Sequence, residues 1–210
     1  MPKVLVVFHS RTGSTARMAD AIAEGARSVR FTEVDVRRLD DLAPATVIGS
    51  VAGWQEAREQ LAARYRTLET VEQLADYDAL VLGSPTRYGV MSAELKNLLD
   101  ATGPLWNRGA LVDKVGGAFS GTATPHGGNE TTIQSIVTVM AHHGMILVPP
   151  GYTEPVLFKA GSPYGATYVG TPTEDDLAAA RHQGKRIAKV AEWVRHAKSH
   201  EHGHAHSHSH

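Results

Sequence analysis

The chain has 210 residues, 42% of them hydrophobic, so it is long enough to bury one substantial core and we expect a single domain. Its formal net charge is -1 at pH 7, whereas nucleic-acid-binding proteins usually carry an excess of positive charge. The same charge gives no attraction to an acidic membrane surface. The chain has no cysteine, which excludes disulfides, thiolate nucleophiles and Cys-based metal sites, so redox chemistry requires a bound cofactor.

Targeting signals are also absent from the sequence. No apolar run approaches the roughly 18 residues that a membrane span needs. The amino terminus lacks the charged, apolar and cleavage regions of a secretory signal. We therefore expect a cytoplasmic protein without a membrane partner.

The first predicted unit is a strand that leads through a short polar loop into a helix. The apolar run VLVVF (4–8) predicts the strand. Apolar residues at helical spacing predict the helix that follows, with an inner face of Met18, Ala19, Ile22 and Ala26. Between the two lies SRTGST (10–15), which we name the phosphate loop.

The phosphate loop combines hydroxyl side chains with the start of a helix. Unpaired backbone N–H groups and the helix dipole attract anions there, and hydroxyls add hydrogen bonds. The loop lacks the Lys of GxxxxGK[ST] and the glycines of GxGxxG, which argues against a triphosphate or dinucleotide site. The residues predicted to hold a phosphate are Ser10, Arg11, Thr12, Gly13, Ser14 and Thr15. The alternative is a structural turn in which the hydroxyls only cap the helix.

Further along the chain, predicted strands and helices alternate. Residues 33–37 alternate polar and apolar side chains, as an edge strand does, and 40–53 are irregular. A charged surface helix is predicted at 54–66 and a buried third strand at 79–82. The helix after that strand has an apolar face of Leu95, Leu98 and Leu99.

The last third of the chain continues this alternation. A fourth strand is predicted at 115–119 and a fifth at 145–148, followed by a Gly/Pro-rich loop over 151–172 and a final helix over 173–197. The helix between these strands has an apolar face of Ile133, Ile136, Val137 and Met140. Such alternation predicts an open parallel sheet covered by helices on both faces.

Three polar, Gly-rich loops follow the first, third and fourth predicted strands. They are the phosphate loop, residues 83–89 and residues 120–128. In a parallel sheet these loops share the carboxyl edge, where ligands bind near the point at which strand order reverses. The sequence therefore predicts one ligand site built from all three loops.

Residues 199–210 differ from the rest and are expected to form a disordered His-rich tail outside a domain of residues 1–198. Six histidines alternate with small or polar residues from His200 to His210. Without cysteines or a fixed geometry, this pattern does not predict a defined metal site.

An ordered set of motifs resembles the WrbA-type NAD(P)H:quinone oxidoreductases, which are flavodoxin-like FMN enzymes. Besides the phosphate loop, the motifs are PTRYGVMS (85–92), GPLW (103–106), HGGNETT (126–132), AHHGM (141–145), PPGY (149–152) and PYGA (163–166). The resemblance covers residues 3 to about 198 and is weakest over 41–70. It implies a flavodoxin-like α/β fold with an open parallel five-stranded sheet of order 2-1-3-4-5.

The resemblance also implies which residues contact FMN. By this resemblance, the phosphate loop binds the FMN phosphate. The residues that contact the flavin ring are Pro85, Thr86, Arg87, Tyr88 and Gly89, then Ser120, Gly121, Thr122, Ala123, Thr124, Pro125 and His126, and finally His142. Trp106 matches an aromatic residue at the substrate face. Thr12 stands where the family often has an aromatic residue, which puts the binding of the nicotinamide donor in doubt, and Pro125 with His126 makes the match there uncertain by one position.

Structural alternatives stand beside these roles. Arg87 could pair with a carboxylate, Trp106 could anchor the core or an interface, and His126 could lie at the mouth of the pocket. Position alone does not separate His142 from His143 near the end of their helix, and only the resemblance selects His142.

As for activity, the resemblance implies two-electron reduction of quinones by NADH or NADPH through a ping-pong mechanism, with no residue acting as a nucleophile. It implies a homotetramer with pockets completed at subunit contacts, for which Trp54, Tyr65 and residues 151–168 are candidates. The alternative is a flavodoxin-type electron carrier that does not oxidise NAD(P)H directly. Dedicated carriers are usually markedly acidic, whereas this chain is nearly neutral. A DNA-binding partner protein finds no support in these residues.

Overall fold

A computed structural model describes the backbone of residues 1–205 and the side chains of residues 1–199. Its centre is a parallel sheet that contains β1 (Lys3–Phe8), β2 (Glu33–Arg38), β3 (Ala79–Pro85), β4 (Val115–Thr122) and β5 (Ile146–Leu147). The strand order is β2-β1-β3-β4-β5, which confirms the expected flavodoxin-like topology and the edge position of β2.

A sixth strand, β6 (Thr167–Val169), is added to these five and pairs in parallel with β4. It lies in the segment expected to be a loop. β5 pairs only with the start of β4, at Val115 and Gly116, whereas β6 pairs with Ser120, Gly121 and Thr122. The short β6 therefore occupies the part of the β4 edge that β5 leaves uncovered.

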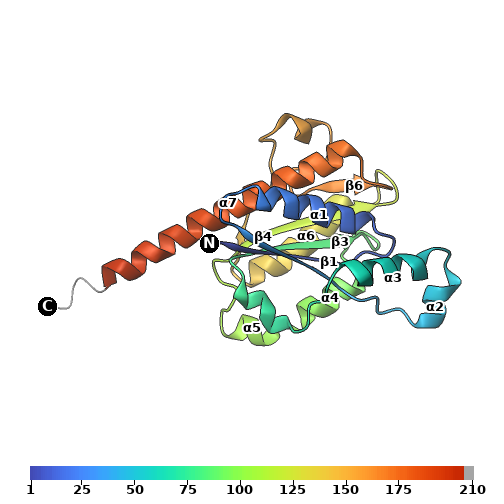
Figure 1. Ribbon diagram of the computed structural model, residues 1–210, viewed down its shortest axis with the longest axis horizontal. Coiled ribbons are helices and arrows are strands. Elements are labelled where there is room, and N and C mark those ends of the chain that lie inside the picture. Colours follow the sequence, from blue (N-terminus) through green and yellow to red (C-terminus); the bar gives the residue numbers. More distant parts are fainter. Residues whose placement is uncertain (206–210) are drawn as a thin grey trace.

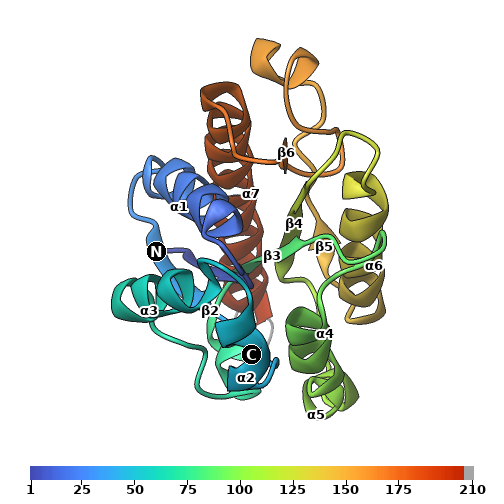
Figure 2. The same ribbon diagram turned by 90° about the vertical axis from the view of Figure 1, so that its right-hand side faces the viewer.

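Helices cover both faces of the sheet (Figure 2). On one face α1 (Ser14–Arg27) packs along α7 (Glu174–Ala205), and on the other lie α4 (Ala93–Asp100), α5 (Gly103–Asn107) and α6 (Asn129–His142). The backbones of α1 and α7 come so close that a Cβ on Gly25 would overlap the carbonyl of Arg181, and one on Gly184 that of Ile22.

The core has two parts, one on each face of the sheet. Val4, Val6 and Phe8 of β1 join the cluster under α1 and α7, whereas Leu5 and Val7 join the cluster under α4 and α6. Every one of these five side chains is buried, as an uninterrupted apolar run predicts for a central parallel strand. The expected inner face of α1 is buried as well.

The long connection from β2 to β3 contains α2 (Ala45–Ser50), α3 (Trp54–Arg64) and the 3-10 helix η1 (Val71–Asp76). The helix α2 corrects the expectation that residues 40–53 are irregular. Trp54 and Tyr65 are buried within their own chain, so they are not available for subunit packing. The Tyr65 ring packs edge-on against Phe8, and its hydroxyl donates to Asp20 at 2.7 Å.

Helix α7 projects beyond the rest of the molecule and ends at Ala205 (Figure 1). It therefore continues into the segment 199–210 that was expected to be disordered, and residues 206–210 of that segment lie outside the described residues. A further 3-10 helix, η2 (Pro155–Phe158), precedes β6. No helix within the described part of the chain is both long and apolar enough to span a bilayer.

Candidate functional site

The three predicted loops meet at the carboxyl edge of the sheet. The Thr86 N–H donates to the Gly121 carbonyl at 2.9 Å, which joins the loop after β3 to the loop after β4. These two loops also touch at Gly89 and Gly128, where a Cβ on Gly128 would lie 2.9 Å from the Gly89 Cα. The phosphate loop joins the group through a 2.9 Å hydrogen bond between the hydroxyls of Thr15 and Tyr168.

In the phosphate loop the hydroxyls divide into engaged and free groups. Gly13 has a left-handed backbone (φ 95°) and donates its N–H to Ser10 Oγ at 3.1 Å, so Ser10 has the turn-forming role. Thr15 is buried and bonded to Tyr168. By contrast, the Thr12 hydroxyl is exposed and the Ser14 hydroxyl half-buried, and neither has a hydrogen-bond partner among the described residues.

Tyr168, which sequence reasoning missed, connects the phosphate loop to β4. Its buried ring lies against Gly121, where a Cβ would overlap the ring. Burial raises the pKa of the Tyr168 hydroxyl, although the Thr15 hydrogen bond and the positive charge of Arg87 oppose this rise. The hydroxyl therefore stays protonated at neutral pH. Thr167, Tyr168 and Val169 are all residue types enriched in strands, and this propensity is the signal that could have found β6.

The loop after β3 presents one cation and one aromatic ring. Arg87 and Val90 exchange backbone hydrogen bonds of 2.8 and 3.1 Å, which close the turn. Tyr88 at its tip has a positive φ of 55° and a fully exposed ring. The Arg87 guanidinium donates to the Thr86 carbonyl at 2.9 Å. Within the described residues Arg87 forms no ion pair, so the carboxylate alternative is not realised.

The loop after β4 combines a buried start with an exposed tip. Ser120 is completely buried, and its hydroxyl has no hydrogen-bond partner among the described residues. The Thr122 hydroxyl donates to the Thr124 carbonyl at 2.7 Å. The tip, which consists of Ala123, Thr124, Pro125 and His126, is exposed, so His126 is at the rim and not in the interior.

Asn129, at the start of α6, ties this loop to β6. Its side-chain amide donates to the Tyr168 carbonyl at 3.2 Å. Its other side-chain atom, Oδ1, is buried without a partner among the described residues. The helix start thus holds a second polar atom that a ligand could satisfy.

Trp106 and His142 lie at the opposite edge of the sheet from these loops. The Trp106 indole N–H donates to the His142 carbonyl at 3.0 Å, at the carboxyl end of α6. Both side chains are exposed, with 59% of Trp106 accessible. Figure 1 shows α5 toward the amino end of β1, whereas β6 lies toward the other end. A single chain therefore does not bring Trp106 and His142 to the three loops, and Trp106 is not a core anchor.

His143 has a structural role that distinguishes it from His142. It is buried, and its Nε2 lies 2.8 Å from the Thr102 hydroxyl, which itself donates to the Leu99 carbonyl at 2.6 Å. The Thr102 hydroxyl thus accepts a hydrogen bond from the Nε2–H group of His143, which assigns the tautomer of this ring. Burial, together with the nearby His142, lowers the pKa of His143.

A buried charged cluster lies directly before the phosphate loop and was also missed by sequence reasoning. His9 is 2% exposed, and its ring lies between the carboxylates of Asp41 and Glu94. Of the residues whose side chains are described, these three alone bring enough ligand atoms together for a metal ion. Because each ring nitrogen faces a different carboxylate, the arrangement is an ion-pair cluster.

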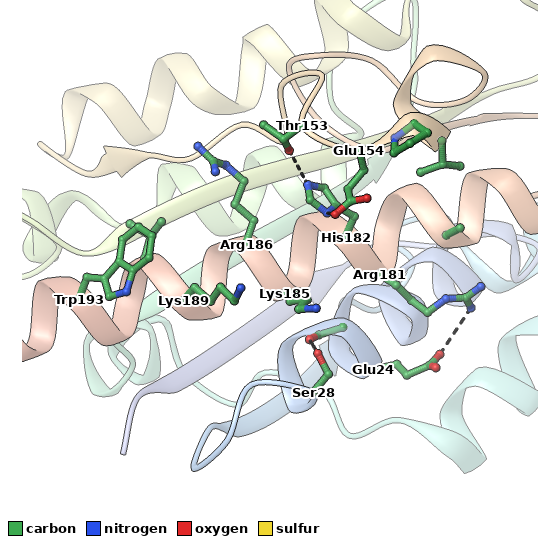
Figure 3. A pocket seen from close by; sticks show the side chains of 15 residues that line it. Glu24, Ser28, Thr153, Glu154, Arg181, His182, Lys185, Arg186, Lys189 and Trp193 are labelled. Atoms are coloured by element: carbon green, nitrogen blue, oxygen red, sulfur yellow. Dashed lines mark hydrogen bonds and ion pairs between the residues drawn. The ribbon is translucent and has the colours of Figure 1, made fainter.

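A cavity of about 740 Å³ lies away from the loops, between α1, α7 and η2 (Figure 3). Arg181 pairs there with Glu24 at 3.6 Å, and Thr153 contacts His182 at 2.7 Å. Burial lowers the pKa of His182, against the charge of Glu154. None of the residues that line this cavity belongs to the predicted site.

Comparisons with known proteins agree with this architecture. Residues 2–154 match the family model described as NADPH-dependent FMN reductase. A protein of Archaeoglobus fulgidus named NAD(P)H dehydrogenase (quinone) is 44% identical, covering 91% of this chain and 98% of the relative. A protein of the same name from Chromohalobacter salexigens is 43% identical with the same coverage. A flavodoxin, WrbA-like protein from Agrobacterium tumefaciens has a TM-score of 0.66 at 27% identity, over 92% of this chain and 99% of that one.

Proposed function

The chain belongs to the NADPH-dependent FMN reductase family, and from this membership we propose that it reduces quinones with electrons from NADH or NADPH, using FMN as its cofactor. The observation that carries the proposal is the convergence of the three loops at one edge of the sheet. Among the described residues, the phosphate loop and the loop after β4 hold hydroxyls without a partner, and the loop after β3 holds Arg87 without a carboxylate.

These unsatisfied groups fit FMN. The Thr12 and Ser14 hydroxyls, together with backbone N–H groups at the start of α1, suit a terminal phosphate. Ser120 Oγ and Asn129 Oδ1 are buried polar atoms without partners among the described residues, and such atoms normally require one. They lie in and beside the loop that the family resemblance assigns to the polar edge of the flavin ring.

The chemistry that FMN supplies when bound is the transfer of two electrons from NADH or NADPH to a quinone. Arg87, free of any carboxylate among the described residues, supplies positive charge that stabilises negative charge developing at the ring edge. Tyr88 offers a flat aromatic face. Protons come from water or from a side chain such as His142 of a second copy of the chain, so no residue is needed as a nucleophile.

We propose that the nicotinamide and the quinone occupy one face of the site in turn, which gives ping-pong kinetics. Initial rates measured over a grid of NADH and benzoquinone concentrations test this order. Parallel lines in the double-reciprocal plot are expected, and intersecting lines would refute it.

We also propose a homotetramer in which Trp106 and His142 of a second copy complete the site. Their exposure supports this, as do the exposed aromatic rings of Tyr88, Tyr152 and Phe158. Tyr152 and Phe158 stack on each other at 5.1 Å between centroids, within the segment 151–168 proposed for subunit packing.

A stopped-flow experiment separates the enzyme from an electron carrier. The FMN-loaded protein is mixed with NADH or NADPH without any reductase, and the yellow flavin absorbance is followed. Direct bleaching, followed by recovery of the colour on addition of benzoquinone, is the expected result. Bleaching that requires an added reductase would support the electron carrier instead.

A further inference from the structure

The cluster around His9 joins three segments that are distant in sequence. The His9 ring lies with Nε2 3.1 Å from Asp41 Oδ1 and Nδ1 3.3 Å from Glu94 Oε2. Its backbone N–H donates to the Gly83 carbonyl at 3.1 Å. The residue that immediately precedes the phosphate loop is thereby connected to β3, to the segment after β2 and to the start of α4.

The two ring nitrogens of His9 each face a carboxylate oxygen, and among the described residues only the contact between Nε2 and Asp41 has the geometry of a hydrogen bond. A neutral imidazole has one N–H and one lone pair, whereas an ionised carboxylate only accepts hydrogen bonds. Both nitrogens can face carboxylates favourably only when both carry a proton. Burial would raise the pKa of Glu94, but the charge of His9 and hydrogen bonds from the backbone and Ser92 outweigh it, and the pKa lies below its usual value.

Asp41 extends the cluster to the phosphate loop. The carboxylate oxygen that contacts His9 also accepts the Trp54 indole N–H at 3.2 Å. Trp54 is 6% exposed, and the Arg11 guanidinium lies 3.7 Å from the centroid of its ring. This distance is within the range of a cation–π interaction. A continuous path of contacts thus runs from His9 through Asp41 and Trp54 to Arg11.

Among the residues whose side chains are described, His9 is the one cation paired with Asp41 and Glu94. Asp40, next to Asp41, pairs with Arg38 at 2.5 Å. Arg11, the nearest further cation, reaches the cluster through the indole of Trp54. The Leu42 N–H donates to the second oxygen of Glu94 at 3.4 Å, so both acids hold the same segment of chain.

We propose that protonated His9 is a positioning residue for FMN, which clamps the segment 41–54 so that Trp54 holds the Arg11 guanidinium at the phosphate loop. This inference rests on the proposed function. Loss of the His9 charge leaves two neighbouring carboxylates without a cation, and their repulsion loosens the segment that supports Trp54. Arg11 then contributes less to the binding of the phosphate.

Flavin titrations of the full chain test whether His9 positions the segment 41–54 for FMN binding. FMN and riboflavin, which lacks the phosphate, are titrated by fluorescence quenching at about pH 6. His9→Gln is expected to weaken FMN about tenfold, the equivalent of one charge-assisted contact, and to leave riboflavin nearly unchanged. Equal losses for FMN and riboflavin would contradict a role in phosphate binding.

A charge-rescue variant separates positioning from simple damage to the fold. His9→Gln combined with Glu94→Gln removes the repulsion and is expected to recover most of the lost FMN affinity. Glu56→Gln, an exposed acid in the first turn of α3, is the matched control and is expected to change nothing. If His9→Gln does not fold, Glu94→Gln alone tests the proposal, and it is expected to cause a smaller loss of FMN affinity.

The Trp54 indole N–H resonance gives a readout that does not depend on FMN. It is assigned with Trp54→Phe in ¹⁵N spectra of the full chain, and its chemical shift is expected to differ between the wild type and His9→Gln, because Asp41 contacts both residues. A wild type that does not bind FMN overturns the proposed function. FMN binding that is equally tight in His9→Gln overturns only the positioning role of His9, as does an indole resonance that the substitution leaves unchanged.

Discussion

Among single residues, the hydroxyls of the phosphate loop are not equivalent. Ser10 and Thr15 satisfy other parts of the chain, through the Gly13 N–H and the Tyr168 hydroxyl. Thr12 and Ser14 have no partner among the described residues and are the ones available to a ligand. We therefore expect affinity for FMN to depend mainly on Thr12 and Ser14, and stability of the fold on Ser10 and Thr15.

Thr12→Val is expected to weaken FMN and leave the melting temperature unchanged. A hydrogen bond to a charged group contributes about 1.5–3 kcal/mol, which corresponds to a loss of roughly ten- to a hundredfold in affinity. Thr15→Val is expected to lower both affinity and melting temperature, because it also breaks the buried bond to Tyr168. Flavin titration and thermal melting on the same preparations check both results. Unchanged affinity in Thr12→Val would make that residue structural.

His143 makes stability depend on pH. Because its pKa in the folded protein lies below the usual value of about 6.5, the unfolded chain binds more protons as the pH falls below that value. The stability associated with neutral His143 is complete above about pH 6.5 and is lost as the pH falls below it. His143→Gln, which keeps a donor for Thr102, is expected to lose less stability between about pH 8 and pH 5 than the wild type. Thermal melts at both pH values measure this, with exposed His126→Gln as the control. Equal losses in all three proteins would contradict the assignment.

At the level of elements, β6 is what brings the phosphate loop and the β4 loop together. It adds a short strand beside the end of β4, and Tyr168 carries the contact onward to Thr15. The ring of Tyr168 occupies the space that a side chain at position 121 would need. The glycine at that position is thus required by packing between strands.

Gly121→Ala is expected to destabilise the protein by about 1–3 kcal/mol, the usual cost of overpacking a filled site. It should also weaken FMN, because displacement of Tyr168 disturbs two of the three loops. Gly49→Ala is the matched control, since nothing lies within 4 Å of a Cβ there. Denaturant unfolding of both variants provides the comparison. A Gly121→Ala protein as stable as the control would show that β6 is not held by this contact.

At the level of the whole molecule, Trp106 and His142 are exposed, and the proposed homotetramer would cover them. Trp106→Ala is expected to raise the Michaelis constant for quinone by about two- to tenfold, since ring stacking contributes about 0.5–1.5 kcal/mol beyond the buried area. FMN should stay bound through the phosphate loop. Trp193→Ala, which removes a similarly exposed indole from α7, is the control.

Quinone kinetics and light scattering on one preparation of Trp106→Ala separate two roles of this residue. A raised Michaelis constant in an intact oligomer supports a pocket wall contributed by a second copy. Normal kinetics in a dissociated protein would refute that role and leave Trp106 as an anchor between subunits.

The sequence by itself determined the features that depend on neighbouring residues. The apolar run 4–8 predicted a strand buried on both faces, and residues at helical spacing predicted the inner face of α1, because hydrophobic periodicity is local. The same alternation placed three polar loops at one edge of a parallel sheet. The order of the strands came from the family resemblance, since the pattern alone left it open.

Only the tertiary structure decided the contacts between distant segments. Tyr168 meets Thr15 across 153 positions of the chain, and His9 meets Asp41 across 32. The three-residue strand β6 is too short for a periodic pattern to predict it. The same holds for the contacts of His9, an isolated histidine before a loop. The family resemblance assigned Trp106 and His142 to the same site as the loops. They lie at the other edge of the sheet, because α5 and the end of α6 return the chain to the amino ends of the strands. Close packing of elements far apart in sequence fixes these positions, and no local preference encodes it.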